Sequence, residues 1–85
     1  MSATETRTVE EIAHKGREVF RRLVEPRLTP EDHGKFVAVA VDQDDFAMAE
    51  SELDTIFQIM ARYPGALMHI ERAGYPAACK IRRVR

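Results

Sequence analysis

The stretch that decides the fold is Phe36-Val37-Ala38-Val39-Ala40-Val41, which follows Gly34-Lys35. A strand with one wet face alternates apolar with polar residues, whereas this run is apolar and rich in β-branched residues at both parities. It therefore predicts a central strand that is buried on both faces. The polar residues Asp42 to Asp45 come next and are typical of a turn.

An amphipathic helix is predicted upstream of this strand. Thr8-Val9-Glu10-Glu11 has the form of a capping box, and apolar residues recur at steps of three and four from Val9 to Leu23. We expect this helix to reach about Glu25, because Pro26 cannot continue it. Gly16 lies within the apolar stripe, where it would let another backbone approach closely. Residues 29–34 are expected to form one helical turn.

Downstream of the strand, residues 45–50 allow two interpretations. Phe46 and Met48 alternate with alanines, which fits a short strand, but the same residues could open a helix. We favour the strand, because Ser51 offers a fresh helix cap. The next helix should stop at Pro64-Gly65, and its predicted buried stripe consists of Leu53, Ile56, Phe57, Met60 and Tyr63.

Two further strands are predicted at residues 66–72 and 75–84, joined by a tight turn at Ala73-Gly74. The order is helix, strand, strand, helix, strand, strand. This order predicts an α+β fold in which helices cover a small, mostly antiparallel sheet. We expect residues 1–7 to form a disordered tail and residues 8–85 to form a single domain.

Composition excludes several classes of protein. The 85-residue chain is 45% hydrophobic and 32% charged, as folded domains are. It has one cysteine, so an intramolecular disulfide framework and a cysteine zinc site are excluded. No apolar run approaches 18 residues and residues 1–8 are polar, so we expect no membrane span, no signal peptide and a cytoplasmic location.

The net charge of −1 hides an asymmetry along the chain. Residues 31–54 hold eight acidic side chains and one basic side chain, whereas residues 62–85 hold six basic side chains and one acidic side chain. The basic end makes weak nucleic-acid binding the alternative function, although a pI of about 6.3 argues against it. The candidate contacts to phosphate are Arg72, Lys80, Arg82, Arg83 and Arg85.

No catalytic, metal or cofactor site is predicted, and we expect no enzyme activity. Residues 42–53 begin like a calcium loop, but they lack its central glycine and its final glutamate. The three histidines share no ligand spacing. Cys79 is expected to be a buried thiol; it would be reactive only if His69 lay beside it as a base.

Five segments in order resemble a family of short uncharacterised bacterial proteins. These proteins have a G-K-aromatic-V-A strand and an R-x-G-Y-x-A closing hairpin, and the resemblance covers about residues 30–82. The family has no established biochemical activity, so no catalytic residue is carried over. Some members resemble the antitoxin half of two-gene cassettes, which implies a protein partner. The matching segments are residues 34–39, 45–46, 51–53, 62–66 and 72–78.

The sequence therefore favours a small accessory or regulatory protein that acts by protein contact. The partner's identity is open, and we also expect a homodimer, because a second copy would add buried area that a 9.7 kDa chain lacks. Apolar residues at the margins of the helical stripes are the predicted interface. They are Val24, Leu28 and Ile59.

Overall fold

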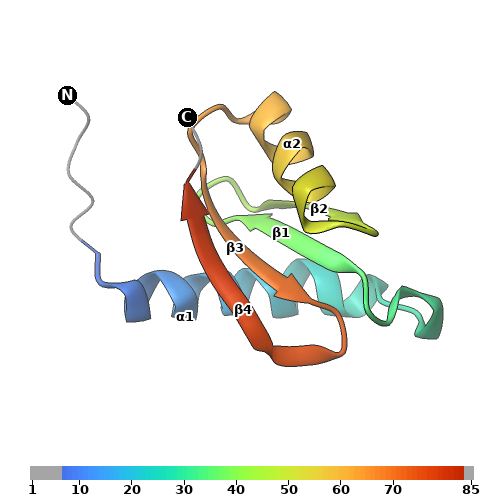
Figure 1. Ribbon diagram of the computed structural model, residues 1–85. Helices are drawn as coiled ribbons and strands as arrows, with labels where there is room; N and C mark the ends of the chain where they lie inside the picture. The colour runs from blue at the N-terminus through green and yellow to red at the C-terminus, as the bar shows by residue number, and fades with distance from the viewer. Residues whose placement is uncertain (1–6, 84–85) are drawn as a thin grey trace.

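A computed structural model describes residues 7–83, with the side chains of residues 76–79 outside the description. It shows an α+β domain with a four-stranded antiparallel sheet and helices on both faces, which confirms the predicted fold class (Figure 1). The elements are α1 (Val9–Val19), η1 (Phe20–Val24), η2 (Glu25–Arg27), η3 (Pro30–Asp32), β1 (Phe36–Ala40), β2 (Asp45–Ala49), α2 (Glu52–Arg62), β3 (Leu67–Arg72) and β4 (Tyr75–Arg83).

The strand β1 lies inside the sheet, as predicted. The strand order is β2-β1-β3-β4, and every neighbouring pair is antiparallel. In the register, Val39 of β1 lies opposite Phe46 of β2 on one side and His69 of β3 on the other. The side chains of residues 37–41 are fully buried, so this segment is dry on both faces of the sheet.

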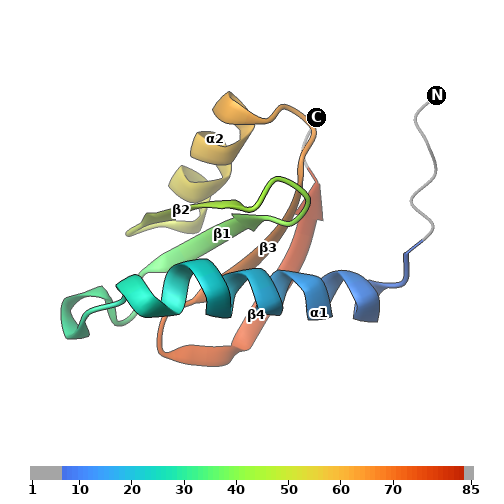
Figure 2. The ribbon, with the colours of Figure 1, turned by 180° about the vertical axis from the view of Figure 1, so that it is seen from behind.

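The alternation of valine and alanine assigns one helix to each face of β1. Val37 and Val39 pack with apolar residues of α1 and η1. Ala38 and Ala40 pack on the opposite face with α2, where small side chains let the helix lie close to the sheet. Figure 2 shows α1 crossing one face of the sheet while α2 lies over the other.

The buried face of α2 differs from the predicted stripe. Leu53 and Phe57 were expected in the core, but 57% and 55% of their surfaces are exposed. Ile59, predicted at the margin, is fully buried and packs with Ile56 against the alanine face of β1. The helix is therefore rotated about its axis relative to the prediction, because Ile56 and Ile59 meet the alanine face.

The first helix begins as predicted and ends differently. The Glu11 amide donates to Thr8 Oγ1 at 3.0 Å, and the Thr8 amide donates to Glu11 Oε1 at 2.7 Å, which completes the capping box. Regular α-helix stops at Val19, and the chain continues as the π-helical turn η1 and the 3-10 turn η2. Within η1, Val24 is fully buried in the core, so it is not available as the surface residue that was predicted.

Residues 45–49 form a strand, which settles the ambiguity in favour of the hairpin. Asp45 ties this strand to the end of α2, because its Oδ2 accepts from Arg62 Nη1 at 3.0 Å and from the Tyr63 hydroxyl at 2.9 Å. Burial acts to raise the pKa of Asp45. Hydrogen bonds from Tyr63, the Phe46 amide and Arg62 outweigh it and hold the pKa below its usual value of 3.8.

The rotation of α2 predicts a large loss of stability for one substitution on this helix and almost none for another. Ile59→Ala should lower the free energy of unfolding by about 2–5 kcal/mol, because it opens a cavity in the core. Phe57→Ala should change it by no more than about 0.5 kcal/mol, because the ring is already half in water. Urea unfolding followed by circular dichroism measures both. A larger loss for Phe57→Ala would contradict this placement of the helix.

The contacts of Asp45 predict a dependence on pH. A carboxyl with a lowered folded-state pKa stabilises the fold above its unfolded pKa and loses that contribution as the pH falls through the folded pKa. Tyr63→Phe should therefore lower the free energy of unfolding by about 1 kcal/mol at pH 7. The difference from the wild type should narrow below pH 3.8, the usual pKa of the carboxyl. If urea unfolding gives the same difference in the free energy of unfolding at pH 7 and at pH 3, the effect of Tyr63→Phe does not come from its hydrogen bond to Asp45.

Candidate functional site

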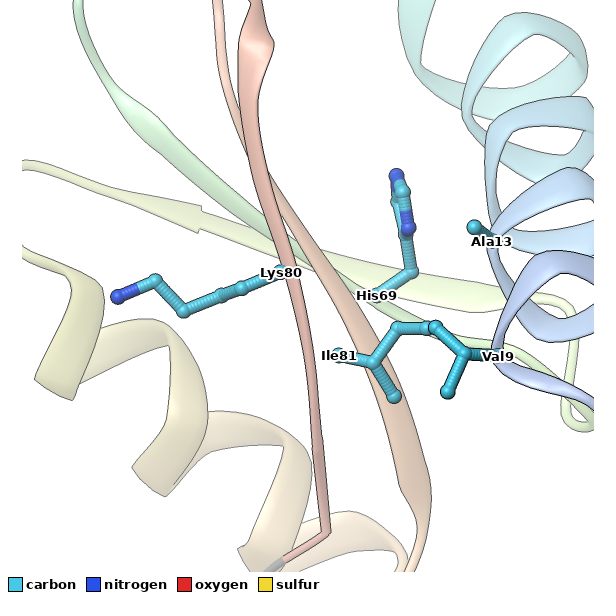
Figure 3. A pocket seen from close by; sticks show the side chains of 5 residues that line it. All are labelled: Val9, Ala13, His69, Lys80 and Ile81. Carbon is cyan, nitrogen blue, oxygen red and sulfur yellow. The ribbon is translucent and has the colours of Figure 1, made fainter.

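A pocket of about 470 Å³ opens between α1 and β4, one of the two edge strands of the described sheet (Figure 3). Val9 and Ala13 contribute one wall, since they stand one helical turn apart on α1. Ile81 of β4 and His69 of β3 lie opposite each other in the register and contribute another. Val9 remains 70% exposed, so the mouth of this pocket is open. The side chains of Val9, Ala13 and Ile81 make its walls largely apolar.

One residue of the pocket wall, His69, belongs to a buried pair of polar side chains. His69 is 1% exposed, and its Nε2 lies 3.0 Å from Oε1 of Glu71, which is also buried. The two residues are two positions apart on β3, so their side chains share one face of the sheet. The two side chains share one hydrogen bond, and which of them donates depends on the tautomer of the imidazole. His69 Nδ1 has no hydrogen-bond partner among the described residues.

Gly16 lets α1 lie directly on His69. A Cβ atom on Gly16 would come within 2.4 Å of both Cβ and Cγ of His69. The close approach predicted at this glycine is therefore present, but the group that approaches is an imidazole side chain rather than a backbone. This contact fixes the height of α1 above the sheet beside the pocket.

The opposite side of β4 carries two cations that share one carboxylate. Lys80 Nζ lies 3.2 Å from Oε1 of Glu52, and Arg82 Nη2 lies 3.9 Å from Oε2 of the same residue. Figure 3 shows Lys80 pointing away from α1, on the other side of β4 from Ile81. Two positive charges with one negative charge leave this side of the strand positive.

Arg72 fastens the end of the β3–β4 hairpin to the start of β1. Its guanidinium lies 5.2 Å from the ring centroid of Phe36 and 4.8 Å from that of Tyr75. Its Nε donates to the carbonyl of Gly34 at 3.0 Å. Arg72 thus connects the G-K-aromatic-V-A strand to the R-x-G-Y-x-A hairpin. We call these contacts of Arg72 with Gly34, Phe36 and Tyr75 the Arg72 clasp.

The structure does not gather the predicted interface into one surface. Val24 and Ile59 are fully buried core residues, and Leu28 is partly buried against the core cluster on the α1 side of the sheet. Of the described residues, the large apolar side chains that are exposed lie elsewhere. They are Val9, Leu53, Phe57 and Tyr75.

The predicted phosphate contacts are likewise divided. Arg72 belongs to the clasp, whereas Lys80 and Arg82 lie further along β4 beside Glu52. Arg83 is exposed at the end of β4, and Arg85 lies outside the described residues. The Cys79 side chain also lies outside them, so the expectation of a buried, inert thiol stays a prediction.

Two parts of this site were missed in the sequence. Glu71 could have been found, because His69 and Glu71 are two residues apart in a predicted strand and must share a face. The pocket walls Val9 and Ala13 carried no such signal. They are ordinary residues of an amphipathic helix, and only the position of α1 over the sheet edge brings them together with Ile81.

Among the described side chains, those of residues 7–75 and 80–83, no group of three or more potential ligands is arranged to hold a metal ion. No helix in that range is long and apolar enough to cross a membrane. No family model, curated protein or solved structure matches the chain. The case for a function therefore rests on the geometry of the pocket and of β4.

The contact between Gly16 and His69 predicts a double-mutant result. Gly16→Ala alone should lower the free energy of unfolding by about 1–3 kcal/mol, because the new methyl group collides with the imidazole. In a His69→Gly background, which removes both the Cβ and the ring, the same change should be neutral or stabilising by up to about 1 kcal/mol, since alanine is the better helix former. Lys15→Ala, on the exposed side of α1, is the control. Equal effects of Gly16→Ala in both backgrounds, measured by urea unfolding, would contradict the contact.

Proposed function

We propose that this protein is a small accessory or regulatory module that acts by binding another protein. The observation that carries the proposal is the nine-residue strand β4 at the edge of the sheet with an open apolar pocket beside it. The resemblance to antitoxin-like proteins in its motifs also favours a protein partner.

The main chain of an edge strand supports binding. One side of β4 pairs with β3, and no strand of residues 7–83 lies along its outer side. Outward N–H and C=O groups of such a strand can pair with an extended segment of another chain. The pocket adds a place for one of that segment's side chains, which gives selectivity as well as affinity.

Binding accounts for this site better than catalysis does. His69 and Glu71 are buried and engage each other, so neither offers an accessible general base. Lys80 contributes to the pocket wall, but its ammonium group lies beside Glu52 on the other side of β4. Of the described polar side chains that line the pocket, Lys80 is thus engaged by Glu52, and the unpaired Nδ1 of His69 is buried.

Nucleic acid is the weaker alternative for this surface. Lys80 and Arg82 already share Glu52, and Arg72 is held by Gly34 and by two aromatic rings. A polyanion would have to displace these contacts. A protein segment also gains the outer main-chain groups and the open pocket, which a polyanion held by its phosphates does not use.

Photo-crosslinking from defined positions tests the proposal. A benzoylphenylalanine at position 9, at the mouth of the pocket, should give a discrete crosslinked species in the native cell, identifiable by mass spectrometry. The same group at position 15, on the exposed side of α1, is the matched control and should give none. Absence of a specific product from position 9, together with a strictly monomeric mass in solution, would overturn the proposal.

Self-association is a separate part of the proposal. Leu53 and Phe57 stand one turn apart on α2, and more than half of each side chain is exposed. Such a pair is a reasonable contact between two copies of the chain. Light scattering at tens of micromolar should give twice 9.7 kDa, and Leu53→Glu with Phe57→Glu should restore the single-chain mass. A single-chain mass for the wild type would remove the homodimer.

A further inference from the structure

We infer that the partner segment is an extended acidic strand that pairs with β4 and places one large apolar side chain in the pocket. This inference rests on the proposed function and names the chemistry of the partner. Acidic residues should flank the apolar one in an alternating pattern, because successive side chains of a strand point to opposite faces of the sheet.

The pocket fixes the position of the apolar residue. Ile81 points to the α1 side of the sheet, where it lines the pocket together with Val9 and Ala13. The residue opposite Ile81 in an added antiparallel strand would have its Cβ about 4.5–5.5 Å away and would point to the same side. Its side chain would enter a space of about 470 Å³, which has room for a leucine or a phenylalanine.

Lys80 and Arg82 determine which residues should flank the apolar residue of the partner segment. Lys80 and Arg82 flank Ile81 and lie on the α2 side of the sheet, where both are half-exposed and share the single carboxylate of Glu52. Carboxylates on either side of the partner's apolar residue would face these two cations and balance the remaining positive charge. Cross-strand pairs of opposite charge stabilise a sheet, whereas like charges directly opposite destabilise it.

The same charges disfavour a second copy of the chain at this edge. A two-fold axis centred on residue 80 would place Lys80 opposite Lys80. Lysine on an edge strand is a common device against such self-pairing. The surface of β4 therefore selects a different, acidic chain.

Peptide binding tests the inference directly. The probe is a fluorescein-labelled peptide of sequence Glu-Val-Glu-Phe-Glu-Val-Glu, titrated with the full chain and followed by fluorescence anisotropy. We expect binding that weakens at least tenfold when the phenylalanine is replaced by serine, and at least tenfold when all glutamates are replaced by lysine. In amide NMR spectra, the largest shifts should fall in β4 and in residues 9–13 of α1.

Variants of this chain separate the contribution of the two cations from that of the pocket. Lys80→Glu with Arg82→Glu should abolish binding of the acidic peptide, and the milder Lys80→Gln with Arg82→Gln should weaken it if the first variant does not fold. Lys15→Glu with Arg21→Glu makes the same change of net charge on exposed positions of the first helical segment and should leave binding within twofold. Ala13→Leu should weaken binding of the phenylalanine peptide and leave that of the serine peptide unchanged.

Three results would overturn the inference. The first is equal binding of the acidic and the basic peptide. The second is single-stranded DNA that binds more tightly than the acidic peptide and is lost with Lys80→Gln and Arg82→Gln. The third is a specific crosslink from position 9 to a protein partner without any binding of the acidic peptide, which would leave the proposed function standing. Failure of the crosslink as well would remove both.

Discussion

Burial of β1 on both faces is the constraint on which the rest of the structure depends. Its valines and alanines alternate, so neither face can be left to water, and a helix is required on each side of the sheet. The alanine face accepts α2 at close range through Ile56 and Ile59, whereas the valine face needs the larger side chains of α1 and η1. A chain of 85 residues thus builds three layers around one strand of five residues.

The way α1 covers its face produces the pocket. This helix must pass over His69, and Gly16 allows it to do so without a collision. The N-terminal turns of α1 then stand beside β4, an edge strand of the described sheet, and the pocket opens between Val9 and Ala13 of the helix and Ile81 of the strand. The open pocket is therefore a consequence of a helix that passes across the sheet as far as its edge.

Local signals in the sequence were sufficient for the elements and their order. The apolar run of β1, the capping box at Thr8 and the cap at Ser51 each depend on neighbouring residues only, and the structure confirms them. The rotation of α2 could not be predicted in this way, because Leu53 and Phe57 continue the helical period as well as Ile59 does. The choice between them is made by the alanine face across the core, which belongs to other segments. The pocket depends on two such tertiary choices at once, so its walls had no local signature.

The charge asymmetry of the chain is largely cancelled by contacts between distant segments, and the exception marks the candidate site. Asp42 and Asp44 of the β1–β2 turn and Asp45 of β2 pair with Arg7, Arg22 and Arg62. Asp32 pairs with Lys35, so four of the eight acidic side chains of residues 31–54 have a cationic partner in these contacts. At β4 two cations share one carboxylate, since Lys80 and Arg82 meet only Glu52 among the described carboxylates. Bulk charge argues against binding to a large polyanion, but a local excess of one positive charge beside an apolar pocket suits a short acidic segment. Selectivity of this kind arises from the spacing of two cations and one pocket along a strand, and the net charge of the chain does not reveal it.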